Sequence, residues 1–194
     1  ATSEARIAIM GATLTGRNIV IRADANNDMS FDAAEQAPID PSGADGLVQS
    51  GEKSSKPLAD FLQSVRLFGG YARSTAVADV TVGPGSHLRA QGGSVVLDAY
   101  ANSEANLVTQ GNVVGVSYAR SDATARVAVA SGATVWASGD VALGAVTDNT
   151  VSAGTKTVVR DVSKAKFSQS PLSFAVTVAE GYQHAITTVD AGAT

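Results

Sequence analysis

A run of oxygen-bearing side chains near the start of the chain has the spacing of a calcium-binding loop. In an EF-hand loop, oxygen ligands at alternate positions let one turn of the chain wrap a Ca²⁺ ion. The residues at the corresponding places are Asp24, Asn26, Asp28, Ser30, Asp32 and Glu35. Place 6 holds Met29 where the sharp turn requires Gly, and the residues before the run alternate as a strand. The spacing predicts that these side chains, apart from Ser30, are calcium ligands. The alternative, which we favour, is that the run is an Asn/Asp-rich turn that ends a strand.

The chain offers little for nucleophilic or general-base catalysis. Cysteine is absent, which excludes a thiolate metal site, a cysteine nucleophile and a disulfide framework. His87 and His184 are the two histidines, and neither has a second ligand at metal-binding spacing. A Gly-x-Ser-x-Gly nucleophile motif is also missing. We therefore predict no catalytic residue and interpret both histidines as surface side chains.

Outward strand positions keep a carbohydrate-active enzyme open as an alternative function. Polysaccharide lyases and hydrolases need clustered carboxylates, or Asp with Arg or Lys, on one strand face. Arg22, Arg89 and Asp98 occupy outward positions. Trp136 follows the inward Val135, so its ring should point outward, where it can stack on a sugar. We favour the interpretation that Arg22, Arg89 and Asp98 lie on ordinary solvated strand faces. We also favour the interpretation that a neighbouring segment covers Trp136.

The composition predicts a folded chain that does not bind nucleic acid. Hydrophobic residues make up 44% of the 194 residues and charged residues 16%, which excludes a disordered polyelectrolyte. Small residues supply most of the apolar share, because aromatic residues are only 5%. A net charge of -4 without a basic run argues against a nucleic-acid surface. No stretch approaches the roughly 18 apolar residues of a membrane span, so we expect none.

An internal repeat organises the chain. Residues Tyr71 to Ser74 recur as Tyr118 to Ser121, 47 residues later, and the register then holds at alternate small and aliphatic positions. The matched positions are Ala76, Ala78, Val80, Val82 and Gly85 in one copy and Ala123, Ala125, Val127, Val129 and Gly132 in the other. Residues 5–25 form a weaker copy, and residues 185–194 form one that stops in its first half, at an offset of 60. We therefore expect residues 1–194 to be one segment of a longer repeat protein.

The alternation of apolar and polar residues predicts half-buried strands. Strand-like runs between the copies, at 112–118 and 173–179, indicate two coils of roughly 23 residues in each repeat and about seven coils in all. A sandwich has no reason to repeat its sequence at a fixed offset, whereas stacked coils place matched residues on top of one another. We therefore predict an all-β fold, a single-stranded parallel β-helix solenoid.

Two polar stretches break the template and predict protruding loop insertions. Residues 32–64 contain three Pro and several Gly, which excludes a central strand. The apolar residues after Pro57 have helical spacing, which predicts a short helix over 57–65. Residues 154–171 are rich in charge, and we expect an arm or hairpin there. Insertions in repeat proteins often lie on the binding face, so these are the expected places for a partner.

Residues 76–85, 88–99 and 124–145 resemble the repeats of filamentous-haemagglutinin-like and related β-strand-repeat adhesins of Gram-negative bacteria. The resemblance implies a right-handed β-helical stalk or fibre, secreted or anchored at the cell surface, that serves adhesion or biofilm without catalytic residues. The expected partners are adjacent repeats of the same chain and a protein or glycan on a host or neighbouring cell. Calcium is the one cofactor that the sequence leaves open.

Overall fold

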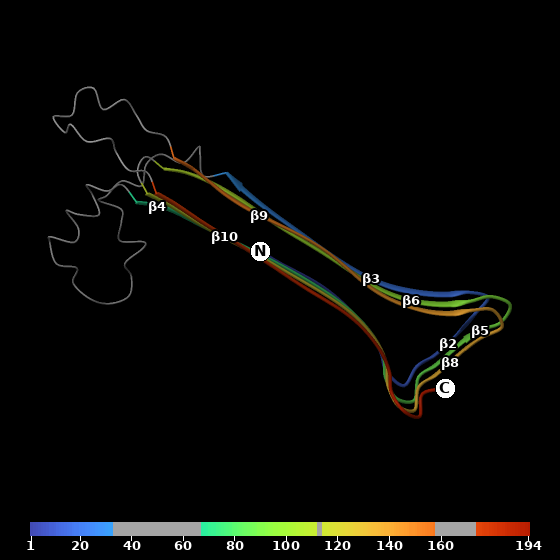
Figure 1. Ribbon diagram of the computed structural model, residues 1–194. Coiled ribbons are helices and arrows are strands. Elements are labelled where there is room, and N and C mark those ends of the chain that lie inside the picture. The colour runs from blue at the N-terminus through green and yellow to red at the C-terminus, as the bar shows by residue number, and fades with distance from the viewer. Residues whose placement is uncertain (33–66, 112–113, 158–173) are drawn as a thin grey trace, which may run out of the picture.

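The computed structural model describes residues 1–32, 67–111, 114–157 and 174–194, and the regular structure in these ranges is entirely β-strand (Figure 1). The strands are β1 (Thr2–Ile9), β2 (Thr13–Gly16), β3 (Ile19–Asp32), β4 (Leu67–Val82), β5 (His87–Ala90), β6 (Val95–Gly111), β7 (Val114–Val129), β8 (Thr134–Ala137), β9 (Val141–Thr157) and β10 (Phe174–Val189). They form three parallel sheets: sheet A (β1-β4-β7-β10), sheet B (β2-β5-β8) and sheet C (β3-β6-β9). The chain visits A, B and C in that order three times and returns to sheet A with β10. The predicted all-β, parallel architecture is confirmed, and it is compatible with a β-helix.

The sequence copies lie directly beside one another in sheet A. Tyr71 on β4 pairs in register with Tyr118 on β7, so the 47-residue offset is one complete circuit of the three sheets. The predictions of two coils in each repeat and of about seven coils in all are therefore wrong. Strands β4, β6, β7 and β9 are 16 or 17 residues long. Each is one continuous strand where the sequence pattern predicts two short ones.

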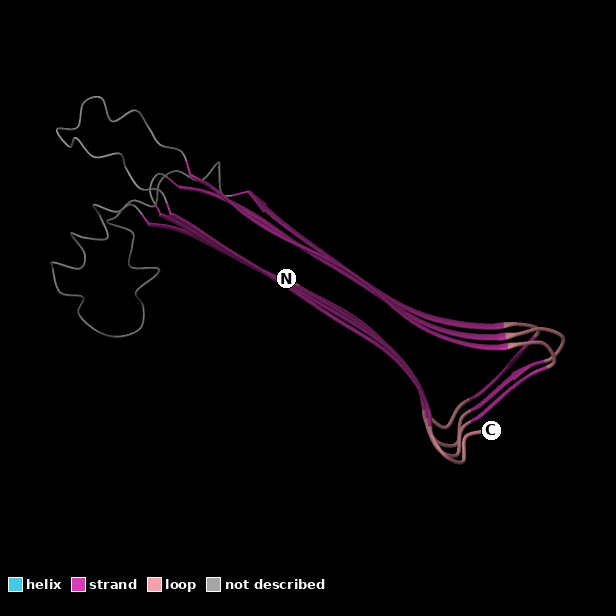
Figure 2. Cartoon of the chain, viewed as in Figure 1, coloured by secondary structure: helices cyan, strands magenta, loops and turns pink. Residues whose placement is uncertain are grey.

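The core lies between sheets A and C, which run together and diverge where sheet B joins them (Figure 2). Ala78, Ala101 and Ala125 are buried where the two sheets run together. Leu88 and Leu97 are buried near sheet B, where the section is wider. Small side chains let the two sheets pack closely where they run together, and a second, smaller buried cluster of Ala72, Leu107 and Ala119 lies further along the same sheets.

A row of hydrogen-bonded polar side chains crosses the interior and lets the long strands continue through their polar positions. Its members, which we call the interior polar ladder, are Asn27 on β3, Ser74 on β4, Ser103 on β6, Ser121 on β7 and Asn149 on β9. The Ser103 hydroxyl donates to Ser74 Oγ at 2.9 Å, and the Ser121 hydroxyl lies 2.8 Å from Ser103 Oγ. The two amides bond to backbone carbonyls, with Asn27 Nδ2 donating to Thr75 O and Asn149 Nδ2 to Ser121 O. Because the buried hydroxyls and both amide NH₂ groups have partners, these polar residues do not end the strands.

The corner after each sheet A strand contains a Gly with positive φ. Gly11, Gly85, Gly132 and Gly192 have φ between 57° and 87°, a region that costs other residues about 1–2 kcal/mol. The amide of Gly85 donates to Gly132 O at 3.0 Å, and that of Gly132 donates to Gly192 O at 3.2 Å. The corners therefore stack on one another, and the last copy follows the same template up to Gly192.

The predicted insertions fall mostly outside the described residues. Asp32 still belongs to β3 and residues 154–157 still belong to β9, so both strands run further than predicted. The helix expected over 57–65 lies outside the described residues. In the part of the chain that the structure describes, no helix long and apolar enough to cross a membrane is found.

Candidate functional site

The residues predicted as calcium ligands lie along a strand rather than in a loop. Asp24, Asn26 and Asp28 are exposed on the outer face of β3, and Asp32 is the last residue of that strand. Side chains two positions apart on a strand are separated by about 6.6–6.8 Å, wider than the oxygens around one Ca²⁺ ion. Glu35 lies outside the described residues. The Asn/Asp-rich turn expected in this run is wrong, because β3 continues to Asp32, and calcium binding stays a prediction.

The neighbouring strand β6 supplies a partner for Asn26, and β3 itself supplies one for Asp24. Asn102 Nδ2 on β6 donates to Asn26 Oδ1 at 3.1 Å, and Arg22 Nε donates to Asp24 Oδ1 at 3.2 Å. Asp28 lies in register beside Glu104, which accepts a hydrogen bond from Asn106 Nδ2. The outer face of sheet C therefore carries carboxylates and amides that bond mainly along their own strands, with the Asn102–Asn26 bond crossing between strands.

Arg22, Arg89 and Asp98 do not come together as one site. Arg22 and Asp98 are register neighbours in sheet C, whereas Arg89 lies on β5 in sheet B. His87 is on the outer face of sheet B, and His184 is on β10 in sheet A. Both histidines are exposed, as predicted, and the separate sheets keep them apart.

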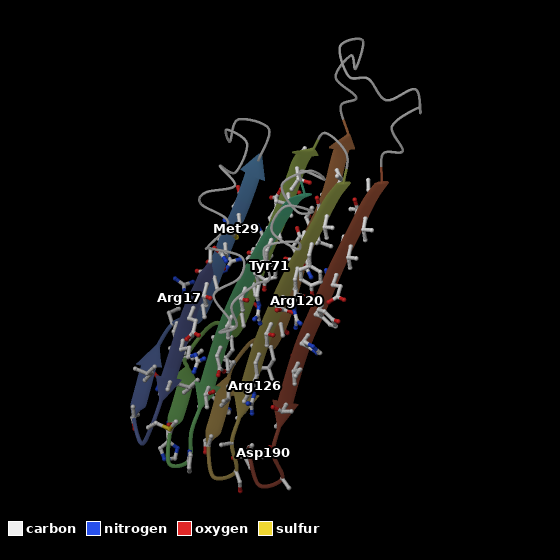
Figure 3. All side chains as sticks on the ribbon, turned by 90° about the vertical axis from the view of Figure 1, so that its left-hand side faces the viewer. Arg17, Met29, Tyr71, Arg120, Arg126 and Asp190 are labelled. Atoms are coloured by element: carbon white, nitrogen blue, oxygen red, sulfur yellow. The ribbon has the colours of Figure 1, made fainter. Side chains whose placement is uncertain are left out.

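The outer face of sheet A carries aromatic and charged side chains that pair with one another. The rings of Tyr71 and Tyr118 stack with centroids 5.5 Å apart and planes 2° apart, and Figure 3 shows Tyr71 and Arg120 on neighbouring strands. The Tyr118 hydroxyl donates to Glu180 Oε2 at 2.7 Å. This hydrogen bond, with burial and the negative charge of Glu180, raises the pKa of Tyr118 above its ordinary value. The guanidinium carbon of Arg120 lies 4.7 Å from the centre of the Tyr182 ring. We therefore interpret this face as a surface whose side chains bind one another.

The outer face of sheet B forms an open cavity of about 500 Å³. Its side chains come from matched positions in three successive circuits. They are Thr13 and Thr15 on β2, His87 and Arg89 on β5, Gln91 in the following corner, and Thr134 and Trp136 on β8, with the inward-facing Leu88 beneath them. Thr13, His87 and Thr134 share one register row, and Thr15, Arg89 and Trp136 share another. The cavity is therefore a product of the stacking, since no single copy contains it.

Trp136 and Arg89 dominate the chemistry of this cavity. The guanidinium of Arg89 lies 5.1 Å from the centre of a Trp136 ring, a cation–π arrangement. Trp136 is 44% exposed, which confirms its predicted outward orientation. The lining contains no Asp or Glu. Hydroxyl, imidazole, amide and guanidinium groups surround an aromatic surface, which is the chemistry of a polar-ligand site.

Sequence reasoning identified Trp136 and Arg89 as outward but missed their association and the three Thr. The available signal was the repeat itself, because an offset of 47 places Arg89 beside Trp136 and His87 beside Thr134. Applying that offset to outward residues, as well as to inward ones, finds the cavity. Comparisons of the chain with family models, curated proteins and solved structures gave no significant match.

Proposed function

We propose that the chain is a segment of a right-handed parallel β-helix that forms the stalk of a bacterial surface adhesin. The in-register stack of successive circuits carries this proposal. Tyr71 lies beside Tyr118, Ala78 beside Ala125 and Val80 beside Val127, so each circuit repeats the side chains of the one before. Connections that return to a parallel sheet are right-handed in about 98% of cases, which supports the assigned hand.

The two ends of the stack support adjacent repeats of the same chain as partners. Strands β1 and β10 are the outer strands of sheet A, with unpaired backbone groups on one side. Apolar residues of the end circuits, such as Ile7 and Leu143, are only partly buried against the core. Asn149 Oδ1 is buried and accepts no hydrogen bond among the described residues. A further circuit would cover these groups and lengthen the stalk by about 4.8 Å.

The outer faces of the three sheets support a structural and binding role rather than catalysis. Some outward side chains of sheets A and C pair with one another, as in the Tyr71–Tyr118 stack and the Asn102–Asn26 hydrogen bond, and the lining of the sheet B cavity contains no carboxylate. We propose that the stalk works outside the cell, where it meets a protein or glycan of a host or neighbouring cell.

Bead adhesion tests this function. Beads coated with the folded protein are passed over layers of epithelial and bacterial cells, and retained beads are counted under flow. Val80→Asp places a charge at a fully buried position and should abolish both the fold and retention. Ala8→Asp, which places the same charge at an exposed outer position of the neighbouring strand β1, should preserve both. Retention of folded beads no greater than that of Val80→Asp beads on every cell layer contradicts the proposal.

A carbohydrate-active enzyme, a polysaccharide lyase or hydrolase, remains the second candidate, and one observation favours it. Asp28 and Glu104 lie in register on neighbouring strands of sheet C, so two carboxylates share one outer face. Glycosidases use such pairs. The enzyme hypothesis predicts new reducing ends or unsaturated products from an acidic or neutral polysaccharide, and loss of that activity in Asp28→Asn. Absence of turnover across a polysaccharide panel contradicts it.

A further inference from the structure

The cavity on sheet B differs from the rest of the described surface because it joins an exposed aromatic ring to a cation without a neighbouring acid. We propose that this cavity binds an acidic saccharide, with Trp136 against the sugar ring and Arg89 against the carboxylate of a uronic acid residue. The inference rests on the proposed function, since it names the ligand that such an adhesin would hold.

Charge is the first argument for an acidic ligand. Arg22, Arg73 and Arg120 each form an ion pair, whereas Arg89 forms none with the described residues. Arg89 and His87 lie in a lining that contains no Asp or Glu, although the chain as a whole carries a net charge of -4. A guanidinium is well suited to carboxylate because its N–H groups form two parallel hydrogen bonds. An acidic ligand is therefore attracted to this face and repelled by the carboxylates on sheet C.

The fixed position of the Arg89 side chain is the second argument for an acidic ligand. Its guanidinium is held against Trp136 by the cation–π contact, and Thr15 and Trp136 flank it in the same register row. A side chain that is already positioned loses less conformational entropy when it binds. The arrangement therefore presents a prepared anion contact rather than a mobile surface charge.

The lining residues favour a sugar over other anions. Arg89 lies over one part of the Trp136 ring, and the 44% of Trp136 that stays exposed supplies an apolar surface for the C–H groups of a pyranose. Thr13, Thr15 and Thr134 carry hydroxyls that donate and accept, and Gln91 carries an amide that does the same. A volume of about 500 Å³ lies within the range of small-molecule sites. An alternation of donors and acceptors around an aromatic surface matches the hydroxyl pattern of one or two sugar units.

Trp136 makes the test direct, because it is the only Trp in the chain and its fluorescence reports on this cavity alone. The protein is titrated with galacturonic acid trisaccharide, with the uncharged galactose trisaccharide and with a sulfated galactose trisaccharide. We expect a saturable fluorescence change with the uronate and an affinity about ten-fold or more lower for the uncharged sugar. Equal affinity for the uncharged sugar overturns the role of charge. Equal or tighter binding of the sulfated sugar overturns the carboxylate assignment.

Variants separate the cavity from other surfaces. Arg89→Gln should weaken uronate binding about ten-fold or more, whereas Arg22→Gln, an exposed Arg on sheet C, should leave it unchanged. Trp136→Ala is measured by calorimetry, since it lacks the fluorophore, and should abolish the heat of binding. Far-ultraviolet circular dichroism establishes that each variant is folded. Unchanged uronate affinity in Arg89→Gln overturns the proposal.

The failures of the two proposals are distinguishable. If folded beads adhere to cells but the uronate does not bind, the saccharide inference is wrong and the adhesin proposal stands. If the uronate binds but beads adhere to no cell layer, the cavity is a saccharide site and the adhesin proposal is wrong.

Discussion

Replacing Ser103 by Ala removes the central hydroxyl of the interior polar ladder. Ser74, Ser103 and Ser121 are each fully buried, and Ser103 links the other two across the space between sheets A and C. Ala is already present at positions 101 and 105 of the same strand face, so Ala at 103 introduces no steric conflict. The change therefore isolates the hydrogen bonds.

The expected cost follows from the bonds that disappear. Each buried hydrogen bond contributes about 0.5–1.5 kcal/mol, and Ser103 takes part in two with the neighbouring hydroxyls. Part of this is recovered, because the Ser121 hydroxyl keeps the Ser103 carbonyl as an acceptor at 2.9 Å. We expect Ser103→Ala to lower the free energy of unfolding by about 1–2 kcal/mol.

Urea unfolding followed by circular dichroism measures this loss. Ser152→Ala, on the exposed face of β9, is the matched control and should change stability by less than about 0.5 kcal/mol. The double variant Ser74→Ala with Ser103→Ala should cost less than the two single changes together, because their shared hydrogen bond is lost only once. Strictly additive effects, or a Ser103→Ala stability equal to that of the control, would refute the ladder as a source of stability.

Three further predictions test separate parts of the structure. The hydrogen bond to Glu180 raises the folded-state pKa of Tyr118, so the stability it contributes is complete below the unfolded value near 10 and is lost as pH rises through the folded value. Glu180→Gln should move the Tyr118 phenolate titration, followed by ultraviolet absorbance, to lower pH, and an unmoved titration contradicts this assignment. Gly93→Ala should lower the free energy of unfolding in urea by about 1–3 kcal/mol, because a Cβ there would lie 2.5 Å from the Arg17 carbonyl oxygen. Gly69→Ala is the control and should be neutral, because the atom nearest to its Cβ would be 3.9 Å away. If calcium binds at the end of β3, chelator should lower the melting temperature and added calcium should restore it, and an unchanged melting temperature removes the site.

The repeat is readable from the sequence because inward residues recur with the same size at the same offset. The 47-residue offset alone matches Ala78 with Ala125 and Val80 with Val127, and both pairs lie in register in sheet A. Alternation also distinguishes the inward and outward faces of β4 and β7. These features depend on local pattern, which the sequence carries directly.

The length of the strands is not readable in the same way, because the interior polar ladder interrupts the alternation of apolar residues, which resumes beyond it at Ala105 and Leu107. Asn27, Ser103 and Asn149 look like the start of a turn, yet they face the interior and are bonded by neighbours far away in the chain. The cavity on sheet B escapes sequence reasoning for a related reason, since its residues come from three circuits and none of them marks a site alone. In both cases the deciding contacts are between circuits.

Paired cysteines test most directly the claim that one 47-residue repeat is one circuit of in-register parallel strands. The chain has no native Cys, so any disulfide comes from the introduced pair. Val77 and Thr124 are register neighbours on the outer face of sheet A, at the strand spacing of about 4.8 Å that a disulfide spans. Val77→Cys with Thr124→Cys should oxidise to an intramolecular disulfide, whereas Val77→Cys with Tyr100→Cys, the pair that coils of about 23 residues would place together, should keep free thiols. A disulfide in the second pair and none in the first would contradict the account.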